Sequence, residues 1–227
     1  MFAHLKKLGL FAIMLSFLGL GCDEKKSAVG PSSVFWKLEY EGRTSWLFGT
    51  MHAPHAAFSK LPEPVKNALA ETRLFLSEIE PDERNQVKIM KGMLLPDNES
   101  LEAKIGKDRF ARLKAVTDKF DPPISPNFMN KNKIWAASLI IAWPRKSTDP
   151  VPVDVLLYEK AKLGGCETKG LETPEEQLAP LDSFTEAEQI QLLVEAIEEA
   201  EGNYKMLNLL MQKYISQDLS GMAEEFY

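Results

Sequence analysis

His52 and Glu78 are the side chains in this sequence whose types and positions best suit chemistry. Each belongs to a short apolar run: His52 follows residues 46–48 and a turn at Gly49, and Glu78 lies within residues 74–79. An imidazole nitrogen and a carboxylate oxygen can hold a divalent metal ion, which activates water for hydrolysis. A carboxylate inside an apolar run is costly to bury unpaired, which favours a partner cation at Glu78. Together the pair makes half of a hydrolytic metal site.

The elements that position these two residues are expected to be neighbouring strand ends of an α/β fold. Residues 34–40 and 45–50 alternate apolar and polar side chains around a turn at 41–44, which predicts a β-hairpin. A helix that opens at Pro62 and Pro64 and ends near residue 72 then leads to a strand over 74–79. Strand, helix and strand in this order bring the end that carries His52 beside the end that carries Glu78.

The rest of the chain is mainly helical in pattern. Apolar spacing predicts helices to about residue 90, from 100 with a break at Gly106, over 131–142 and 153–162, from 185, and over 204–215. Residues 166–171 form a short strand, and Thr173 with Glu176 forms a capping box that starts another helix. Glu172 therefore lies where a strand passes into a helix, and it either serves the site or only interacts with the helix dipole.

We predict a mixed α/β fold, with a mixed β-sheet flanked by many helices. The 227 residues are 44% apolar and 26% charged, enough for one good core. Few strands accompany the many helices, and no closing strand precedes Tyr227, so we expect a domain that is incomplete at its C-terminus. A net charge of −6 argues against nucleic acid as the main partner, because phosphate binding needs a basic face.

Residues 1–22 have the features of a lipoprotein-type signal peptide. Basic residues precede an apolar run over 8–20, which is too short to span a bilayer but suits a signal-peptide core. The run ends in Leu-Gly-Leu-Gly-Cys, which resembles a lipoprotein cleavage box, so that Cys22 becomes the acylated first residue and anchors the chain to a bacterial membrane. The alternative is ordinary secretion with Cys22 incidental.

The predicted organisation after the signal peptide is a polar tether over 23–33 and a folded domain over 34–227. We expect the domain to lie on the extracytoplasmic, periplasmic side of the membrane, and Asp23 directly after the lipidation site favours the inner membrane. Cys166 is then the one free thiol, so no internal disulfide forms.

Several segments in order resemble the TraB/GumN family, which is related to the Tiki metalloproteases. They cover almost everything after the tether and are residues 47–52, 76–80, 132–135, 153–157, 170–173 with Gln177, and 214–219. The most specific of them are the Gly-x-x-His box that ends at His52 and the Gly-Leu-Glu-Thr segment that contains Glu172.

The resemblance implies a mixed α/β fold with active-site groups at strand ends, in a family whose best-understood members are metal-dependent proteases. It maps the family's first Gly-x-x-His histidine onto His52 as a metal ligand, and a glutamate after the next strand onto Glu78 as ligand or base. Glu172 matches the Gly-Leu-Glu-Thr glutamate, and Asp154 an aspartate without an assigned role. The role of His55 stays open. The family's second Gly-x-x-His box belongs to a C-terminal region beyond this sequence.

These observations predict a membrane-tethered, metal-dependent peptidase with a peptide or protein substrate, incomplete in this chain. Its catalytic residues are Glu78 and Glu172, and its metal is held by His52 and Glu78. Nitrogen and oxygen ligands without a thiolate leave manganese, cobalt and zinc open. One alternative is a non-catalytic extracytoplasmic protein that binds a peptide, a polysaccharide-export partner or a cofactor on the same fold. The other is a structural lipoprotein in which His52 is an ordinary loop residue.

Overall fold

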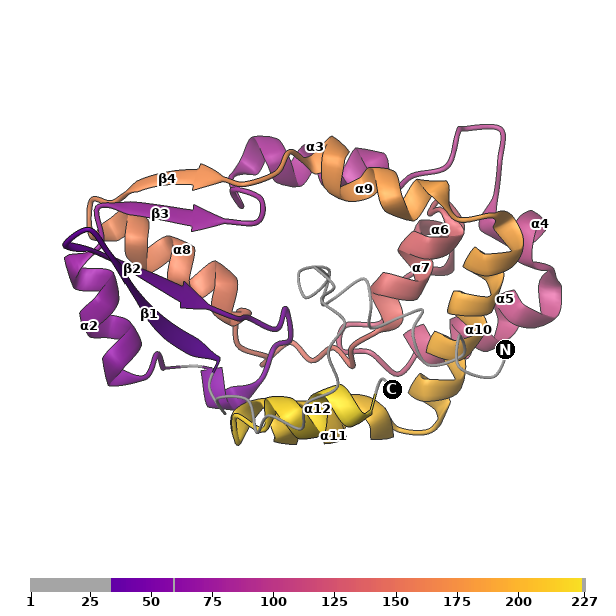
Figure 1. Cartoon of the computed structure of the whole chain (residues 1–227). Coiled ribbons are helices and arrows are strands. Elements are labelled where there is room, and N and C mark those ends of the chain that lie inside the picture. Colours follow the sequence, from indigo (N-terminus) through magenta and orange to yellow (C-terminus); the bar gives the residue numbers. More distant parts are fainter. Residues whose placement is uncertain (1–33, 59, 226–227) are drawn as a thin grey trace, which may run out of the picture.

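The computed structural model describes residues 34–58 and 60–225. It has a strand end and a helical end that two pairs of helices connect (Figure 1). The strand end contains β1 (Phe35–Tyr40), β2 (Arg43–Phe48), α2 (Glu63–Glu71), β3 (Leu74–Ser77), α8 (Val153–Leu163) and β4 (Glu167–Gly170). The helical end contains α4 (Leu101–Ile105), α5 (Lys107–Thr117), α6 (Pro126–Met129), α7 (Ile134–Ile141) and α10 (Glu186–Glu201).

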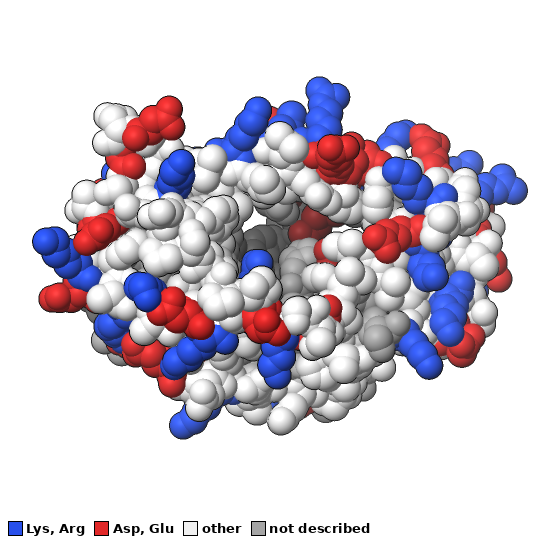
Figure 2. Space-filling model, turned by 180° about the vertical axis from the view of Figure 1, so that it is seen from behind, with Lys and Arg blue, Asp and Glu red and all other residues white. Residues whose placement is uncertain are grey.

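The two connecting pairs run along opposite sides of the molecule (Figure 1). One pair is α3 (Glu83–Gly92) with α9 (Pro174–Ser183), and the other is α11 (Lys205–Ile215) with α12 (Leu219–Glu224). A short 3-10 turn, η2 (Ala56–Phe58), follows the loop after β2. Seen from behind, the molecule has a hollow near the middle of its face, and basic and acidic side chains are scattered over the surface around it (Figure 2).

The predicted hairpin is confirmed. β1 and β2 pair antiparallel, with Phe35 opposite Phe48 and Tyr40 opposite Arg43. The two turn residues, Glu41 and Gly42, have φ angles of 46° and 72°. Left-handed backbone at both positions is what a two-residue type I′ turn requires, and its twist matches that of the strands.

The mixed α/β class is also confirmed, although the described strands form two separate sheets of two strands each. β3 pairs parallel with β4, from Leu74 opposite Glu167 to Ser77 opposite Gly170. The helix α8 crosses between these two strands and packs against both, as a parallel connection requires. β3 therefore has β4 and not the hairpin as its hydrogen-bonded neighbour, yet its end still meets the end of β2.

Local sequence signals define several helix boundaries. The Thr173 hydroxyl accepts from the Glu176 amide while the Glu176 carboxylate accepts from the Thr173 amide, so the predicted capping box begins α9. The same arrangement at Thr185 and Glu188 begins α10. Gly106, with a φ angle of 83°, separates α4 from α5 as expected.

The largest core lies at the helical end. Most of its members come from α4, α5, α7 and α10, and its large, deeply buried side chains include Leu101, Ile105, Leu113, Ile141, Leu193 and Ile197. A smaller core at the strand end joins α2 to α8 through Leu61, Val65, Val153 and Leu157. The hairpin and β3 have exposed leucines, so the strand end buries much less of its apolar surface.

Candidate metal centre

The loop that carries His52 is anchored by the residues on both sides of it. Met51 and Ala53 are buried against α11, in a cluster with Leu210 and Met211, whereas the His52 side chain stays about 40% exposed. Because the neighbours of His52 point inward, its imidazole is directed out of the loop. The phenol of Tyr214 on α11 also donates to the Gly49 carbonyl at 2.6 Å. A distant helix therefore fixes both ends of the Gly-x-x-His box.

Glu78 lies one residue beyond the end of β3, where the backbone of the next segment holds it. The Glu172 amide donates to the Glu78 carbonyl at 2.8 Å, and the Leu171 amide donates to the Ser77 carbonyl at 2.8 Å. Gly170 makes this approach possible, because a Cβ there would lie 2.9 Å from the Glu80 amide nitrogen. The glycine of the Gly-Leu-Glu-Thr segment is thus required by close backbone packing.

Asp154 contacts His52 from the first turn of α8. Its Oδ2 lies 3.0 Å from His52 Nδ1, and its side chain is about 28% exposed. Its other oxygen, Oδ1, is buried and has no hydrogen-bond partner among the described residues. A buried carboxylate oxygen without a partner is costly unless water or a ligand reaches it. Burial, followed by the charge of the same aspartate, raises the pKa of the Tyr214 phenol above its ordinary value.

His52 lies between two carboxylates. Its Nε2 is 3.4 Å from Glu78 Oε2, on the side of the ring away from Asp154. The hydrogen bond to Asp154, followed by that to Glu78, raises the pKa of His52 to about 10, although desolvation opposes the shift. Gln177, in the first turns of α9, places its amide nitrogen 3.4 Å from the same Glu78 oxygen. Without metal, the site is therefore an imidazolium held by two carboxylates.

The spacing of the two expected ligands suits a metal ion. A separation of 3.4 Å between His52 Nε2 and Glu78 Oε2 is long for a hydrogen bond. Two ligands about 2.1 Å from a tetrahedral ion lie about 3.4 Å apart, the same separation. Asp154 on Nδ1 would hold the ring with Nε2 toward the ion, which is the carboxylate–histidine–metal pattern. Among the described residues, no group of three or more His, Cys, Asp or Glu side chains is arranged to hold a metal.

The other predicted residues lie around this pair without joining it. Glu172 is adjacent through its backbone amide, and its carboxylate makes no hydrogen bond or ion pair within the described part of the chain. Glu80, the last residue of the matching segment 76–80, accepts a hydrogen bond from the Thr168 hydroxyl at 2.5 Å. The His55 ring accepts from the Ala57 amide at 3.1 Å, which is a loop contact. Cys22 lies outside the described residues.

Three contributors to the site were not predicted from the sequence. Asp154 had no assigned role, and its position in the first turn of a helix suggests only a favourable interaction with the helix dipole. Gln177 was noted as part of the Gly-Leu-Glu-Thr segment, and Tyr214 as part of the last matching segment. The order of these segments along the chain indicated the family, but it did not predict which side chains contact one another.

The fold and the site define a class of protein, a mixed α/β fold with a histidine and a glutamate at adjoining strand ends. Comparison with known proteins identifies the family. It belongs to the TraB/PrgY/gumN family, whose model matches residues 34–226. The predicted family is therefore confirmed.

A curated relative with a more specific name also matches the chain. The chain is 27% identical over 193 residues to Metalloprotease TIKI2 of Danio rerio, a match that covers 72% of this chain and 37% of the relative. The chain thus spans little more than a third of that protein's length. No solved structure matches the chain.

Proposed function

We propose that this chain is a metal-dependent peptidase domain of the TraB/PrgY/gumN type, with His52 and Glu78 as metal ligands. The observation that carries the proposal is the position of His52, which has Asp154 on Nδ1 at 3.0 Å and Glu78 facing Nε2 at 3.4 Å. The similarity to a protein named as a metalloprotease supports peptide hydrolysis as the reaction. Manganese, cobalt and zinc all suit one nitrogen and one oxygen donor.

Each side chain has a distinct task in this proposal. Asp154 holds the proton of Nδ1 and so presents Nε2 as the ligand, while Gln177 restrains the Glu78 carboxylate. A bound divalent ion would lower the pKa of water and polarise a peptide carbonyl. Glu172, fixed beside Glu78 through the backbone and free to turn its carboxylate, is the candidate to carry a proton to the leaving amine.

We further propose that Cys22 anchors this domain to the outer side of a bacterial inner membrane. The support comes from the sequence of residues 1–23, namely basic residues, an apolar run and a cleavage-like box. Within residues 34–58 and 60–225, no helix is long and apolar enough to cross a bilayer. Mass spectrometry of the N-terminal peptide should find an acylated Cys22, and Cys22→Ala should release the chain from membranes. An unmodified cysteine would contradict the anchor.

A second candidate is a non-catalytic binding protein on the same fold. What favours it is that the described residues bring together two ligands for a metal, without a third from His, Cys, Asp or Glu. In this case the site between His52 and Glu78 would hold a charged group of a peptide or other partner without hydrolysing it.

Metal content separates the two candidates. The purified chain is dialysed against trace manganese, cobalt and zinc and analysed for bound metal, together with His52→Ala, Glu78→Ala and the control His55→Ala. The peptidase proposal expects about one ion per chain, retained in the His55 variant and lost in the other two, because one-ligand sites bind weakly.

Cleavage of a fluorescence-quenched peptide library then tests the reaction. Activity that requires the bound metal and disappears in His52→Ala and Glu78→Ala supports the peptidase. Circular dichroism confirms that each variant is folded. A folded wild-type chain that retains no metal, or normal cleavage by either variant, contradicts the proposed site. Retained metal without cleavage favours the binding protein.

A further inference from the structure

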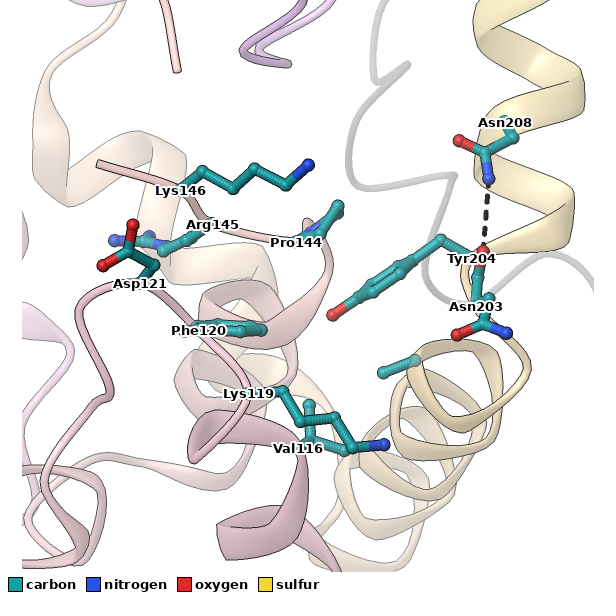
Figure 3. Close-up of a pocket in the computed structure, with 11 residues that line it drawn as sticks. Val116, Lys119, Phe120, Asp121, Pro144, Arg145, Lys146, Asn203, Tyr204 and Asn208 are labelled. Carbon is teal, nitrogen blue, oxygen red and sulfur yellow. Dashed lines mark hydrogen bonds between the residues drawn. The ribbon is translucent and has the colours of Figure 1, made fainter. Parts of the chain in front are cut away.

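A pocket lies at the helical end, between the end of α5, the segment after α7, and the junction of α10 and α11 (Figure 3). Its volume is about 520 Å³, within the range of pockets that hold small organic molecules. The elements that form it contribute neither His52 nor Glu78. Neither the predicted chemistry nor the proposed peptidase function uses it.

The floor of this pocket is apolar and rigid. Val116, Phe120, Ala200 and Tyr204 line it, and all four are at most 8% exposed. The Tyr204 phenol donates to the Ile141 carbonyl at 3.2 Å, which fixes the ring. Burial, followed by the nearby Glu199 carboxylate, raises the pKa of Tyr204 from its ordinary value of about 10 to about 12, so the phenol stays neutral at physiological pH.

The rim of the pocket is basic. Lys119, Arg145 and Lys146 line it, and none of the three forms an ion pair within the described part of the chain. Figure 3 shows Lys146 and Lys119 on opposite sides of the Tyr204 ring. The chain as a whole has a net charge of −6, whereas these three unpaired cations make the rim of the pocket locally positive.

The acids near this rim are already engaged. Asp121 lines the pocket, and its carboxylate accepts from the Ser147 hydroxyl at 2.7 Å. Glu201, which lies close enough to Lys119 to feel its charge, accepts hydrogen bonds from two guanidinium nitrogens of Arg112, Nε at 3.0 Å and Nη2 at 2.7 Å. The positive field of the rim is therefore only partly neutralised from within the chain.

We propose that this pocket binds a small amphiphilic anion, with a phosphate or carboxylate head at the basic rim and an apolar body on the floor. The head would meet Lys119, Arg145 and Lys146, which attract an anion and donate hydrogen bonds to its oxygens. The body would contact the exposed edges of Phe120 and Tyr204 and displace the water that still reaches them. A ligand with only one of these two parts satisfies half of the site.

Calorimetric titration of the full chain with three probes tests this division. Octyl phosphate has both parts, inorganic phosphate has the head alone, and octanol has the apolar body alone. We expect octyl phosphate to bind at least about ten-fold more tightly than either half, because charge attraction and apolar burial add. Equal affinity for octyl phosphate and octanol would contradict the role of the basic rim in binding. Equal affinity for octyl phosphate and inorganic phosphate would contradict the role of the apolar floor.

Charge reversal on the rim assigns the binding to this pocket. The double variant Arg145→Glu with Lys146→Glu, and separately Lys119→Glu, changes exposed side chains on two different segments. Each should weaken octyl phosphate binding by about ten-fold or more, since attraction becomes repulsion at short range.

The control is Lys91→Glu on α3, which makes the same change of charge at an exposed position outside the pocket. It should bind octyl phosphate as the unchanged chain does. Circular dichroism shows whether each variant is folded. If one rim variant does not fold, the other still tests the pocket. Equal weakening in the control and the rim variants would mean that net charge alone sets the affinity, and the pocket proposal would fail. Because His52 and Glu78 are unaltered, these results are separate from the metal test.

Discussion

The two ends of this molecule are built in opposite ways. At the helical end, side chains such as Leu193 and Ile141 are fully buried in a core shared by α4, α5, α7 and α10. At the strand end, Leu47 is 56% exposed and Leu76 is 48% exposed, and the two small sheets rely on α2 and α8 for cover. The candidate metal centre lies at the less densely packed end.

This difference shows how the site is held. Packing of apolar side chains makes the helical end stable, whereas single polar contacts over long sequence distances place the site residues. The bond from Tyr214 to Gly49 joins residues 165 positions apart, and that from Gln177 to Glu78 joins residues 99 apart. We therefore expect substitutions in the core of the helical end to cost the most stability, and substitutions of partly exposed polar side chains at the strand end to change mainly the site.

Leu193→Ala should have the largest effect on stability. It removes a fully buried side chain from α10 and leaves a cavity, which costs about 2–5 kcal/mol of unfolding free energy. Leu47→Ala, the same change on the exposed face of β2, should cost about 0.5 kcal/mol or less. Urea unfolding followed by circular dichroism measures both, and similar losses for the two would remove the contrast between the ends.

Gly170→Ala should be the most damaging small change at the strand end. The added methyl group would lie 2.9 Å from the Glu80 amide nitrogen and 3.0 Å from the Glu172 carbonyl oxygen, and both are backbone atoms that cannot turn away. We expect a loss of about 1–3 kcal/mol and reduced metal retention, because β4 must move from Glu78. The control on the same strand is Lys169→Ala, an exposed position, and an equally large loss there would refute the close-packing argument.

Asp154→Asn should affect the metal and leave stability nearly unchanged. The substitution keeps the shape of the side chain but removes the charge that orients His52, so metal affinity should fall about 10–100-fold. Glu159→Gln on the exposed side of the same helix is the matched control. Competition with a chromogenic chelator measures the affinity, and the same value in both variants would show that Asp154 does not act through His52.

The smallest expected effect is on the pH dependence of the metal-free chain. Because the folded pKa of His52 is raised to about 10, its ion pairs stabilise the fold fully below its unfolded pKa of about 6.5. That contribution disappears as the pH rises through about 10, and exposure to solvent keeps it small. Imidazole NMR should show His52 protonated at neutral pH, with a lower midpoint in Asp154→Asn. A midpoint near 6.5 in the unchanged chain would contradict the paired site.

Much of the local structure and half of the site could be read from the sequence. The hairpin around Glu41 and Gly42, the capping box at Thr173 and the break at Gly106 depend on interactions within a few residues. His52 and Glu78 stood out because each follows an apolar run, and the sequence order gave reason to bring their strand ends together. The family was also recognisable, because its motifs occur in a fixed order along one chain.

What only the tertiary structure decided is which side chains complete the pair. Asp154 reaches His52 because α8 packs across β3 and β4, and Gln177 reaches Glu78 because Gly170 lets the backbone of β4 approach. The sequence also placed the carboxylate of Glu172 in the site, whereas the structure shows contact through its backbone amide. Periodicity and motifs describe one element at a time. The position of one helix against another is decided by the packing of their side chains, and that is a property of the whole fold.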